Sequence, residues 1–334
     1  MNIVSLFAGC GGLDKGFEEA GFRISWANEY DKDIWETFEK NFPKTKLDRS
    51  DLRKVDSKDI PDCIGIIGGP PCQSWSLAGS MGGLNDSRGQ LFYEYLRILD
   101  DKQPLFFLAE NVAGLLSSAH IDSFDGIIKA FSKLNYHITY KLLNTADFGV
   151  PQDRMRVIIV GYRKDVFDKG FEFPEPDTKK VTLQETIKNL KDSKPAKEKN
   201  KTNGINSTTP ANHEHMIGGF STMYMSRNRC RGWDTQSFTI QAGGRHAPLH
   251  PDSTPMIKKG ADEWVFDPKS KKTYRRLSVR ECARIQTFPD DFIFYYSDVS
   301  VGYKMIGNAV PVLFAQRIAK KIKSDIKSVK SRLK

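Results

Sequence analysis

The stretch GGPPCQSWS, from Gly68 to Ser76, holds a cysteine directly behind two prolines. Each proline fixes its φ near about −65° and lacks an N–H, so Cys72 leaves the apolar run before it along a rigid path. A thiolate is a strong nucleophile, and nearby donors or cations lower the pKa of the thiol. A lone cysteine can also be a small apolar residue that fills a turn, so the rest of the chain has to decide between these interpretations.

A carboxylate and two arginines accompany the cysteine. Glu110 ends the apolar run LAENV, and Arg154 and Arg156 enter another apolar run in QDRMRV. A buried carboxyl is costly unless it is paired or used, and strand alternation predicts that the two arginines share a face. The alternative is a pair of solvent-facing charges. Together with Cys72, these groups could hold a polar ring, attack it and stabilise the charge that develops.

A second polar set lies at the N-terminal end of the chain. The first apolar run ends in FAGCGG, Phe7 to Gly12, where glycines allow a ligand to approach the backbone. Its spacing is not GxGxxG. Glu29 ends the next apolar run, at the position that reaches ribose hydroxyls in doubly wound folds. Asp51 and Leu52 lie shortly before the third apolar run. A cofactor with a charged tail, a ribose and an adenine, such as S-adenosylmethionine, fits these points, although the turn alone could be a simple strand–helix connection.

The elements that must position these residues alternate between strand and helix patterns. Strands are expected at 2–7, 23–30, 63–69, 104–112, 136–144 and 155–163, and helices at 13–21, 32–42, 91–99 and 123–134. This alternation predicts an α/β fold with a mostly parallel sheet covered on both faces. After about residue 173 the chain becomes irregular, with short β-like pieces at 224–228, 237–244 and 263–266. Residues 310–326 regain helical spacing and could pack back on the first domain.

Charge and composition narrow the class of protein. The 334 residues are 39% hydrophobic and 28% charged, as in ordinary globular proteins, and no apolar run is long enough to cross a bilayer. The five cysteines include no CxxC pair, which argues against a zinc site or disulfide framework and for a reducing, cytoplasmic compartment. Residues 1–177 carry 21 Lys and Arg against 27 Asp and Glu (−6), whereas 178–290 carry 21 against 11 (+10). The basic middle is expected to face a polyanion, and the alternative is a solvated lysine-rich surface.

The motifs, taken in order, resemble those of a known family. FAGCGG, NEYD, Asp51-Leu52, GPPCQSWS, AENV, QDRMR, RRLSVRECARIQTFPDDF and GYKMIGNAVP follow one another along essentially the whole chain. This series is similar to the ordered motifs of the DNA (cytosine-5) methyltransferases. The resemblance implies a Rossmann-like S-adenosylmethionine-dependent domain made of residues 1–173 and 300–334. It also implies a small domain, 174–299, that contains a target-recognition region at about 178–275.

The resemblance also implies roles for the catalytic residues. Cys72 would add to C6 of a cytosine flipped out of duplex DNA, so that C5 can take the methyl group. Glu110 would bond N3 and the exocyclic amine, Arg154 would contact O2, and Arg156 would help to orient the site. No metal is expected.

Further residues are implied in cofactor and DNA binding. The expected cofactor residues are Phe7, Ala8, Gly9, Gly11, Gly12, Leu13, Glu29, Tyr30, Asp51, Leu52, Pro71, Leu91, Asn308, Ala309 and Val310. The expected DNA-binding residues are Gln73, Ser76, Arg88, Arg227, Arg229, Arg231 and Arg245, and in an extended segment Arg227, Arg229 and Arg231 would point to one side. Within the family, the variable middle is most similar to members that methylate the inner cytosine of GGCC, in restriction-modification systems. A monomer acting on double-stranded DNA is expected.

Two other functions stay open at this point. The related tRNA cytosine methyltransferases share the PPCQ and ENV motifs, but they carry a CFT tripeptide where this chain has SFT, with Ser237 in place of the cysteine. A non-catalytic DNA-binding relative is the other alternative, and the presence of Cys72, Glu110 and both arginines argues against it.

Overall fold

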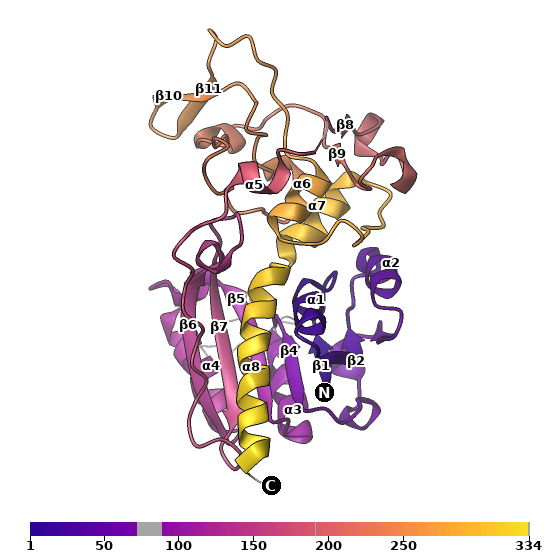
Figure 1. The fold of residues 1–334 in the computed structure, drawn as a ribbon, viewed down its shortest axis with the longest axis vertical. Coiled ribbons are helices and arrows are strands. Elements are labelled where there is room, and N and C mark those ends of the chain that lie inside the picture. The colour runs from indigo at the N-terminus through magenta and orange to yellow at the C-terminus, as the bar shows by residue number, and fades with distance from the viewer. Residues whose placement is uncertain (72–88, 191, 333–334) are drawn as a thin grey trace.

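A seven-stranded sheet forms the centre of the lower lobe in the computed structural model, which describes residues 1–71, 89–190 and 192–332 (Figure 1). Its strand order is β3-β2-β1-β4-β5-β7-β6. The strands are β1 (Asn2–Leu6), β2 (Arg23–Asn28), β3 (Lys46–Asp48), β4 (Gly65–Gly68), β5 (Phe106–Val112), β6 (Tyr136–Asn144) and β7 (Met155–Arg163). The first five pair in parallel, and only β7 and β6 are antiparallel to their neighbours. The predicted α/β fold with a mostly parallel sheet is confirmed.

Helices cover both faces of this sheet because its central strands are apolar on both sides. Along β7, Ile158 and Val160 belong to one buried cluster and Ile159 to the other, as strand alternation requires. The cluster with Ile159 includes buried residues of α3 (Gly89–Lys102) and α4 (Ile121–Ser132). The opposite cluster includes residues of α1 (Gly12–Glu19), α2 (Lys32–Asn41) and α8 (Val312–Arg332).

Helix α8 lies beside α1, although about 300 residues separate them in the chain (Figure 1). A Cβ on Gly16 would lie 2.5 Å from the Cβ of Ala315, so the glycine is what lets the two helices approach. The apolar face expected on this helix is buried and consists of Val312, Ala315, Ile318, Ala319 and Ile322. The prediction that the C-terminal helix packs back on the first domain is therefore confirmed.

The upper lobe is irregular and holds short elements (Figure 1). These are α5 (Leu183–Ile187), β8 (Lys194–Pro195), β9 (Glu214–His215), β10 (Met256–Gly260), β11 (Glu263–Phe266), α6 (Val279–Ile285) and α7 (Val299–Asn308). The β-like piece at 263–266 is a strand, but 224–226 is a turn of 3₁₀ helix and 237–244 contains no strand. The backbone of 237–240 instead forms hydrogen bonds with the segment before β7. The Ser237 N–H donates to the Pro151 carbonyl, and the Ile240 N–H donates to the side-chain oxygen of Gln152.

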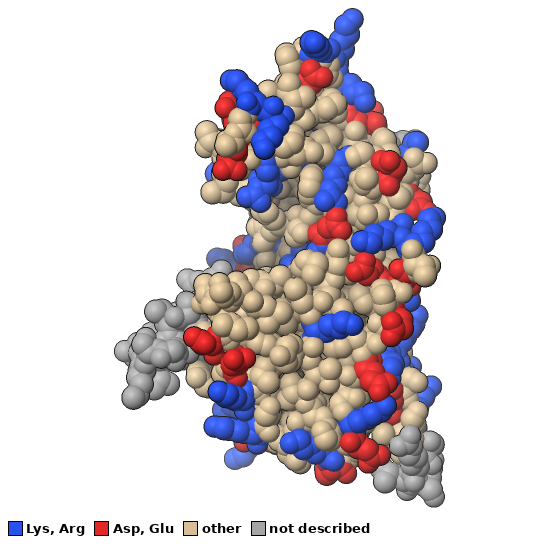
Figure 2. Space-filling model, turned by 90° about the vertical axis from the view of Figure 1, so that its left-hand side faces the viewer, with Lys and Arg blue, Asp and Glu red and all other residues tan. Residues whose placement is uncertain are grey.

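A hollow separates the two lobes on one side of the molecule (Figure 2). Lys and Arg side chains lie on the upper lobe beside this hollow, in agreement with the +10 charge of residues 178–290 (Figure 2). None of the helices in the described ranges is both long and apolar enough to cross a membrane. The lobes meet at the sheet edge where β1, β4 and β5 end and where the antiparallel β7 begins.

Candidate active site

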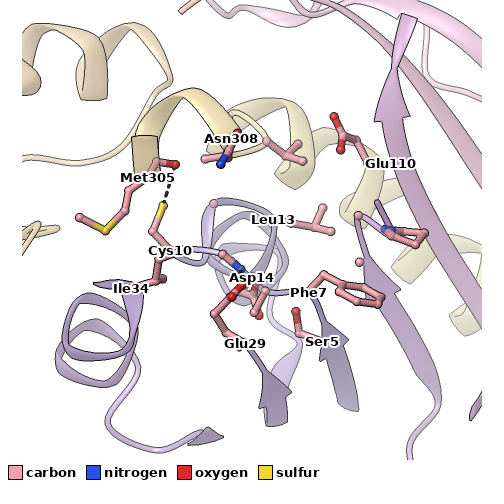
Figure 3. Close-up of a pocket in the computed structure, with 18 of the residues that line it drawn as sticks. Ser5, Phe7, Cys10, Leu13, Asp14, Glu29, Ile34, Glu110, Met305 and Asn308 are labelled. Atoms are coloured by element: carbon pink, nitrogen blue, oxygen red, sulfur yellow. Dashed lines mark hydrogen bonds between the residues drawn. The ribbon is translucent and has the colours of Figure 1, made fainter. Parts of the chain in front are cut away.

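A cavity of about 440 Å³ opens at this edge of the sheet (Figure 3). Its size is in the range of small-molecule sites. The elements that line it are the turn after β1, the start of α1, and the ends of β2, β4, β5 and α7. The predicted site residues among the lining are Phe7, Ala8, Gly9, Gly12, Leu13, Glu29, Pro71, Glu110, Asn308, Ala309 and Val310.

The turn between β1 and α1 takes a backbone path that most residues avoid. Gly9 and Gly11 have φ of 57° and 91°, and Phe7 has φ of 55°, which is strained for an aromatic residue. A Cβ on Gly12 would lie 2.4 Å from the Val310 carbonyl oxygen, so a glycine is needed where the segment after α7 crosses α1. The Cys10 thiol donates to the Met305 carbonyl at 3.4 Å. The turn and residues 305–310 therefore form one wall.

Glu29 is held by the turn and by its own strand end. Its Oε2 accepts from the Gly9 N–H at 2.9 Å, and its Oε1 accepts from the Asp31 N–H at 2.7 Å. Burial raises the pKa of Glu29, while these two N–H donors lower it. The carboxylate thus lies in the cavity beside the glycines, as the sequence predicts for a ribose-binding group.

The nucleophile candidate lies at the limit of the described chain. Pro70 and Pro71 follow β4 and line the cavity, and the Asn111 amide donates to the Pro70 carbonyl at 3.0 Å. Four predicted residues, Cys72, Gln73, Ser76 and Arg88, lie outside the described residues. Pro71, the residue directly before Cys72, is described and lines the same cavity as Glu110.

Glu110 and Arg156 form an ion pair across two strands. Arg156 is opposite Val112 in the β5–β7 ladder, which makes it a diagonal neighbour of Glu110 on the same face. Nε of Arg156 lies 2.7 Å from Oε1 of Glu110, although the N–H does not point along the line to the oxygen. The other carboxylate oxygen would lie 3.3 Å from a Cβ on Gly69, so the pair is next to the end of β4.

Arg154 is not part of this ion pair and is not among the residues that line the cavity. It precedes β7, so strand alternation does not govern it. Its guanidinium is 1% exposed and donates to the carbonyls of Ile240, Gly307 and Ala309 at 3.0, 2.8 and 3.0 Å. Burial lowers the pKa of Arg154 to about 9. Its contacts connect the segment before β7 to the upper lobe and to the end of α7.

Five predicted cofactor residues are not among the cavity-lining residues. Gly11 shapes the turn, Leu52 is buried in the core, and Leu91 packs on the α3–α4 cluster. Asp51 caps a 3₁₀ turn and pairs with Arg53, which lowers the pKa of Asp51. Tyr30 is 69% exposed and lines a neighbouring surface hollow, which shares Asp31 with the cavity.

The four upper-lobe arginines expected to bind DNA divide into two kinds. Arg229 is buried and donates to the carbonyls of Tyr224 and Met223, and Arg231 pairs with Asp153 and stacks 4.1 Å over the Phe238 ring.

Arg227 and Arg245 are exposed. The expected alternation of Arg227, Arg229 and Arg231 toward one side is therefore not seen, because this segment follows a 3₁₀ turn and bonds inward instead of forming a strand.

Several lining residues were not anticipated from the sequence. They are Ser5, Cys10, Asp14, Asp31, Ile34, Gly68, Gly69, Pro70, Asn111, Val112 and Met305. Two of them carried a usable signal, because Ser5 interrupts an apolar strand and Asp14 lies among the apolar residues of α1. The described residues contain no group of three or more His, Cys, Asp or Glu side chains that could hold a metal.

Comparison with known proteins agrees with this geometry. The family model for C-5 cytosine-specific DNA methylases matches residues 1–324. The chain is 57% identical to the Type II methyltransferase M.MthTI of Methanothermobacter thermautotrophicus over 98% of this chain and 99% of that protein. It is 54% identical to M.FnuDI of Fusobacterium nucleatum, with 98% and 95% covered.

Solved structures share the fold at lower identity. The methyltransferase EhMeth of Entamoeba histolytica superposes with a TM-score of 0.70 at 17% identity, covering 98% of each chain. A DNMT2 from Spodoptera frugiperda superposes with a TM-score of 0.68 at 18% identity, covering 97% of this chain and 99% of that chain. These structures support the fold alone, whereas the family match and the close relatives support the activity. The chain belongs to the C-5 cytosine-specific DNA methylase family and is a DNA (cytosine-5) methyltransferase of the Type II kind.

Proposed function

We propose that the protein transfers a methyl group from S-adenosylmethionine to C5 of a cytosine flipped out of duplex DNA, through a covalent bond between Cys72 and C6. One observation carries this proposal: a single cavity joins the strained glycine turn and Glu29 to the end of β4 and to Glu110. The first set suits a nucleoside with an amino-acid tail, and the second suits a polar ring.

The residues around the cavity fit the cofactor. The Glu29 carboxylate would bind the ribose hydroxyls, and Phe7, Gly9 and Leu13 would surround the methionine part, with Asn308 to Val310 closing the wall. Tyr30, in the adjoining hollow with Trp35 and Arg49, would face the adenine, near Asp51 and Leu52. When bound, this cofactor supplies an electrophilic methyl group.

The chain's own groups would activate the base. The Cys72 thiolate adds to C6, which places electron density on C5. Glu110 would accept a hydrogen bond from the amino group and, when protonated, donate its proton to N3, which takes up part of that density. After C5 has taken the methyl group, its proton leaves to a base, the bond between Cys72 and C6 breaks, and the ring becomes aromatic again.

The arrangement of the arginines changes their assigned roles. Arg156, paired with Glu110 at the cavity edge, is the arginine that we infer contacts the base. Arg154 is fully buried and donates to three carbonyls, so we infer that it positions the segment before β7.

The DNA is inferred to lie in the hollow between the lobes, where the basic upper lobe faces it (Figure 2). Arginine is the usual reader of guanine in the major groove, and Arg227 and Arg245 are the exposed candidates. We propose GGCC as the target, on the resemblance of the variable middle to GGCC-modifying members, with Gln73, Ser76 and Arg88 beside the flipped base. We also propose that the protein works as a cytoplasmic monomer, with domains of residues 1–173 plus 300–334 and 174–299.

Methylation mapping tests the proposal. The protein is incubated with S-adenosylmethionine and a DNA library, and 5-methylcytosine is located by bisulfite sequencing, with Cys72→Ala and a tRNA pool in parallel. We expect methylation of the inner cytosine of GGCC, none with Cys72→Ala, and none in tRNA. Methylation at another sequence would refute the target only, whereas an active Cys72→Ala enzyme would refute the nucleophile.

A further inference from the structure

Two buried polar side chains lie at the floor of the cavity. Ser5 in β1 and Asp14 in the first turn of α1 both line the cavity, and both are 0% exposed (Figure 3). Among the described residues, no group makes a hydrogen bond of normal geometry to Ser5 Oγ or to either carboxylate oxygen of Asp14. Glu29, on the same side of the cavity, instead accepts an N–H at each oxygen.

This arrangement is costly in the unliganded protein. A buried polar group without a partner destabilises the fold, and a buried carboxylate does so more strongly. The neighbours of Asp14 in α1, Leu13, Gly16 and Phe17, are buried and apolar, so an apolar side chain at position 14 would avoid the cost. A carboxyl group here calls for a partner that the described residues do not supply.

The charges around Asp14 indicate which partner is missing. The charged groups that act on it are Glu18 of α1 and Glu29, directly after β2, and both are acidic. The Cys10 thiol nearby is neutral, because burial raises its pKa strongly. Burial has the largest effect and raises the pKa of Asp14 to about 7, and the Ser5 hydroxyl opposes this with a smaller lowering effect. A cation in the cavity would relieve this unfavourable environment.

We propose that the Asp14 carboxylate, supported by Ser5, is the counter-charge for the α-ammonium group of the cofactor. This inference rests on the proposed function, since it concerns how S-adenosylmethionine is recognised in the cavity that Asp14 lines. Two charges in surroundings of low dielectric interact over several ångströms, so the ammonium need not touch the carboxylate. Asp14 is therefore a positioning residue that makes the site selective for an amino-acid tail that carries its amino group.

A double comparison of ligand and variant tests the inference. Calorimetry measures the affinity of S-adenosylhomocysteine and of S-adenosyl-4-thiobutyrate, which lacks only the amino group, for the wild type and for Asp14→Asn. We expect Asp14→Asn to weaken S-adenosylhomocysteine binding by about tenfold and to leave the deamino compound unchanged. Glu36→Gln, which neutralises an exposed carboxylate of α2 outside the cavity, is the matched control and should alter neither affinity.

Equal effects on the two ligands would show a merely structural role and would overturn the inference, as would the absence of any effect. If Asp14→Asn fails to fold, the wild type alone decides, because its affinity for S-adenosylhomocysteine, but not for the deamino compound, should rise from pH 6 to pH 8 as Asp14 ionises. A flat profile for both compounds would overturn the inference while leaving the proposed function intact. If the wild type bound no S-adenosylhomocysteine at all, both would fail.

Discussion

Nε of Arg156 lies 2.7 Å from Oε1 of Glu110, across two antiparallel strands at the edge where the parallel strands end. Both side chains are largely buried, with 12% of each exposed, and the carboxylate lines the cavity. The pair keeps a carboxylate available at this edge, because the arginine compensates the charge that burial would otherwise disfavour.

Replacing this carboxylate should separate catalysis from cofactor binding. Glu110→Gln keeps the shape of the side chain but removes the carboxyl group that would accept from the amino group of the base and share a proton with its N3. We expect the rate of methyl transfer to fall by at least about a hundredfold while the affinity for S-adenosylhomocysteine changes little. Tritium transfer and calorimetry measure the two quantities. A loss of cofactor affinity as large as the loss of rate would contradict the assignment.

Arg154 should matter more for stability than for the chemical step. Arg154→Lys keeps a positive charge but cannot reach the carbonyls of Ile240, Gly307 and Ala309 together. We expect the free energy of unfolding to fall by about 2–3 kcal/mol, measured by urea denaturation.

The exposed pair of Arg49 and Glu39 offers the control, because Arg49→Lys should change stability by no more than about 0.5 kcal/mol. Equal stability of the Arg154→Lys and Arg49→Lys variants would show that the buried contacts contribute little.

The pKa of Asp14 predicts how the stability of the cofactor-free protein depends on pH. In the folded state the pKa of Asp14 is about 7, so the group stays protonated up to about pH 7, whereas in the unfolded chain it ionises near its ordinary pKa of 3.8. Between these values the folded state binds more protons, so the Asp14 contribution to stability decreases as the pH rises.

The slope contributed by Asp14 should approach about −1.4 kcal/mol per pH unit between pH 4.5 and 6.5. Asp14→Asn removes this titration, so the difference in unfolding free energy between the two proteins isolates it. If this difference in unfolding free energy did not vary with pH, the pKa of Asp14 would not be raised in the folded protein.

The two exposed arginines of the upper lobe should affect DNA binding. Arg227→Ala and Arg245→Ala are each expected to weaken binding to a GGCC duplex by about 1–3 kcal/mol, with a smaller loss on a scrambled duplex if the side chain reads a base. Fluorescence anisotropy at fixed salt measures both duplexes. Lys169→Ala is the control, since Lys169 lies beyond the far end of β7 and pairs with Glu172. Equal losses on both duplexes would indicate phosphate contact alone.

Sequence reasoning succeeded where a pattern reports directly on local structure. The runs at 136–144 and 155–163 are strands with those bounds, because both are rich in β-branched and aromatic residues, which favour strands. The glycine turn, Glu29 and Glu110 came together in one cavity, because the ends of parallel strands meet at one edge.

The failures arose where tertiary contacts decide. Alternation could not predict the position of Arg154, because β7 begins one residue later and the arginine is drawn to carbonyls far away in the chain. The same holds for Arg229 and Arg231, whose partners lie in their own lobe and before β7. Ser5 and Asp14 carried a local signal, but only the structure shows that neither has a hydrogen bond of normal geometry to another described residue.

The wall shared by the glycine turn and residues 305–310 has a consequence for synthesis of the protein. Cys10 bonds Met305, and Gly12 fits against Val310, so the first turn of the chain meets its partner only after some 300 further residues have been translated. At about 5–20 residues per second, this takes roughly 15–60 s. During that time a nascent chain has no closed cofactor cavity, and it is therefore expected to be unable to modify the DNA near which it is being made.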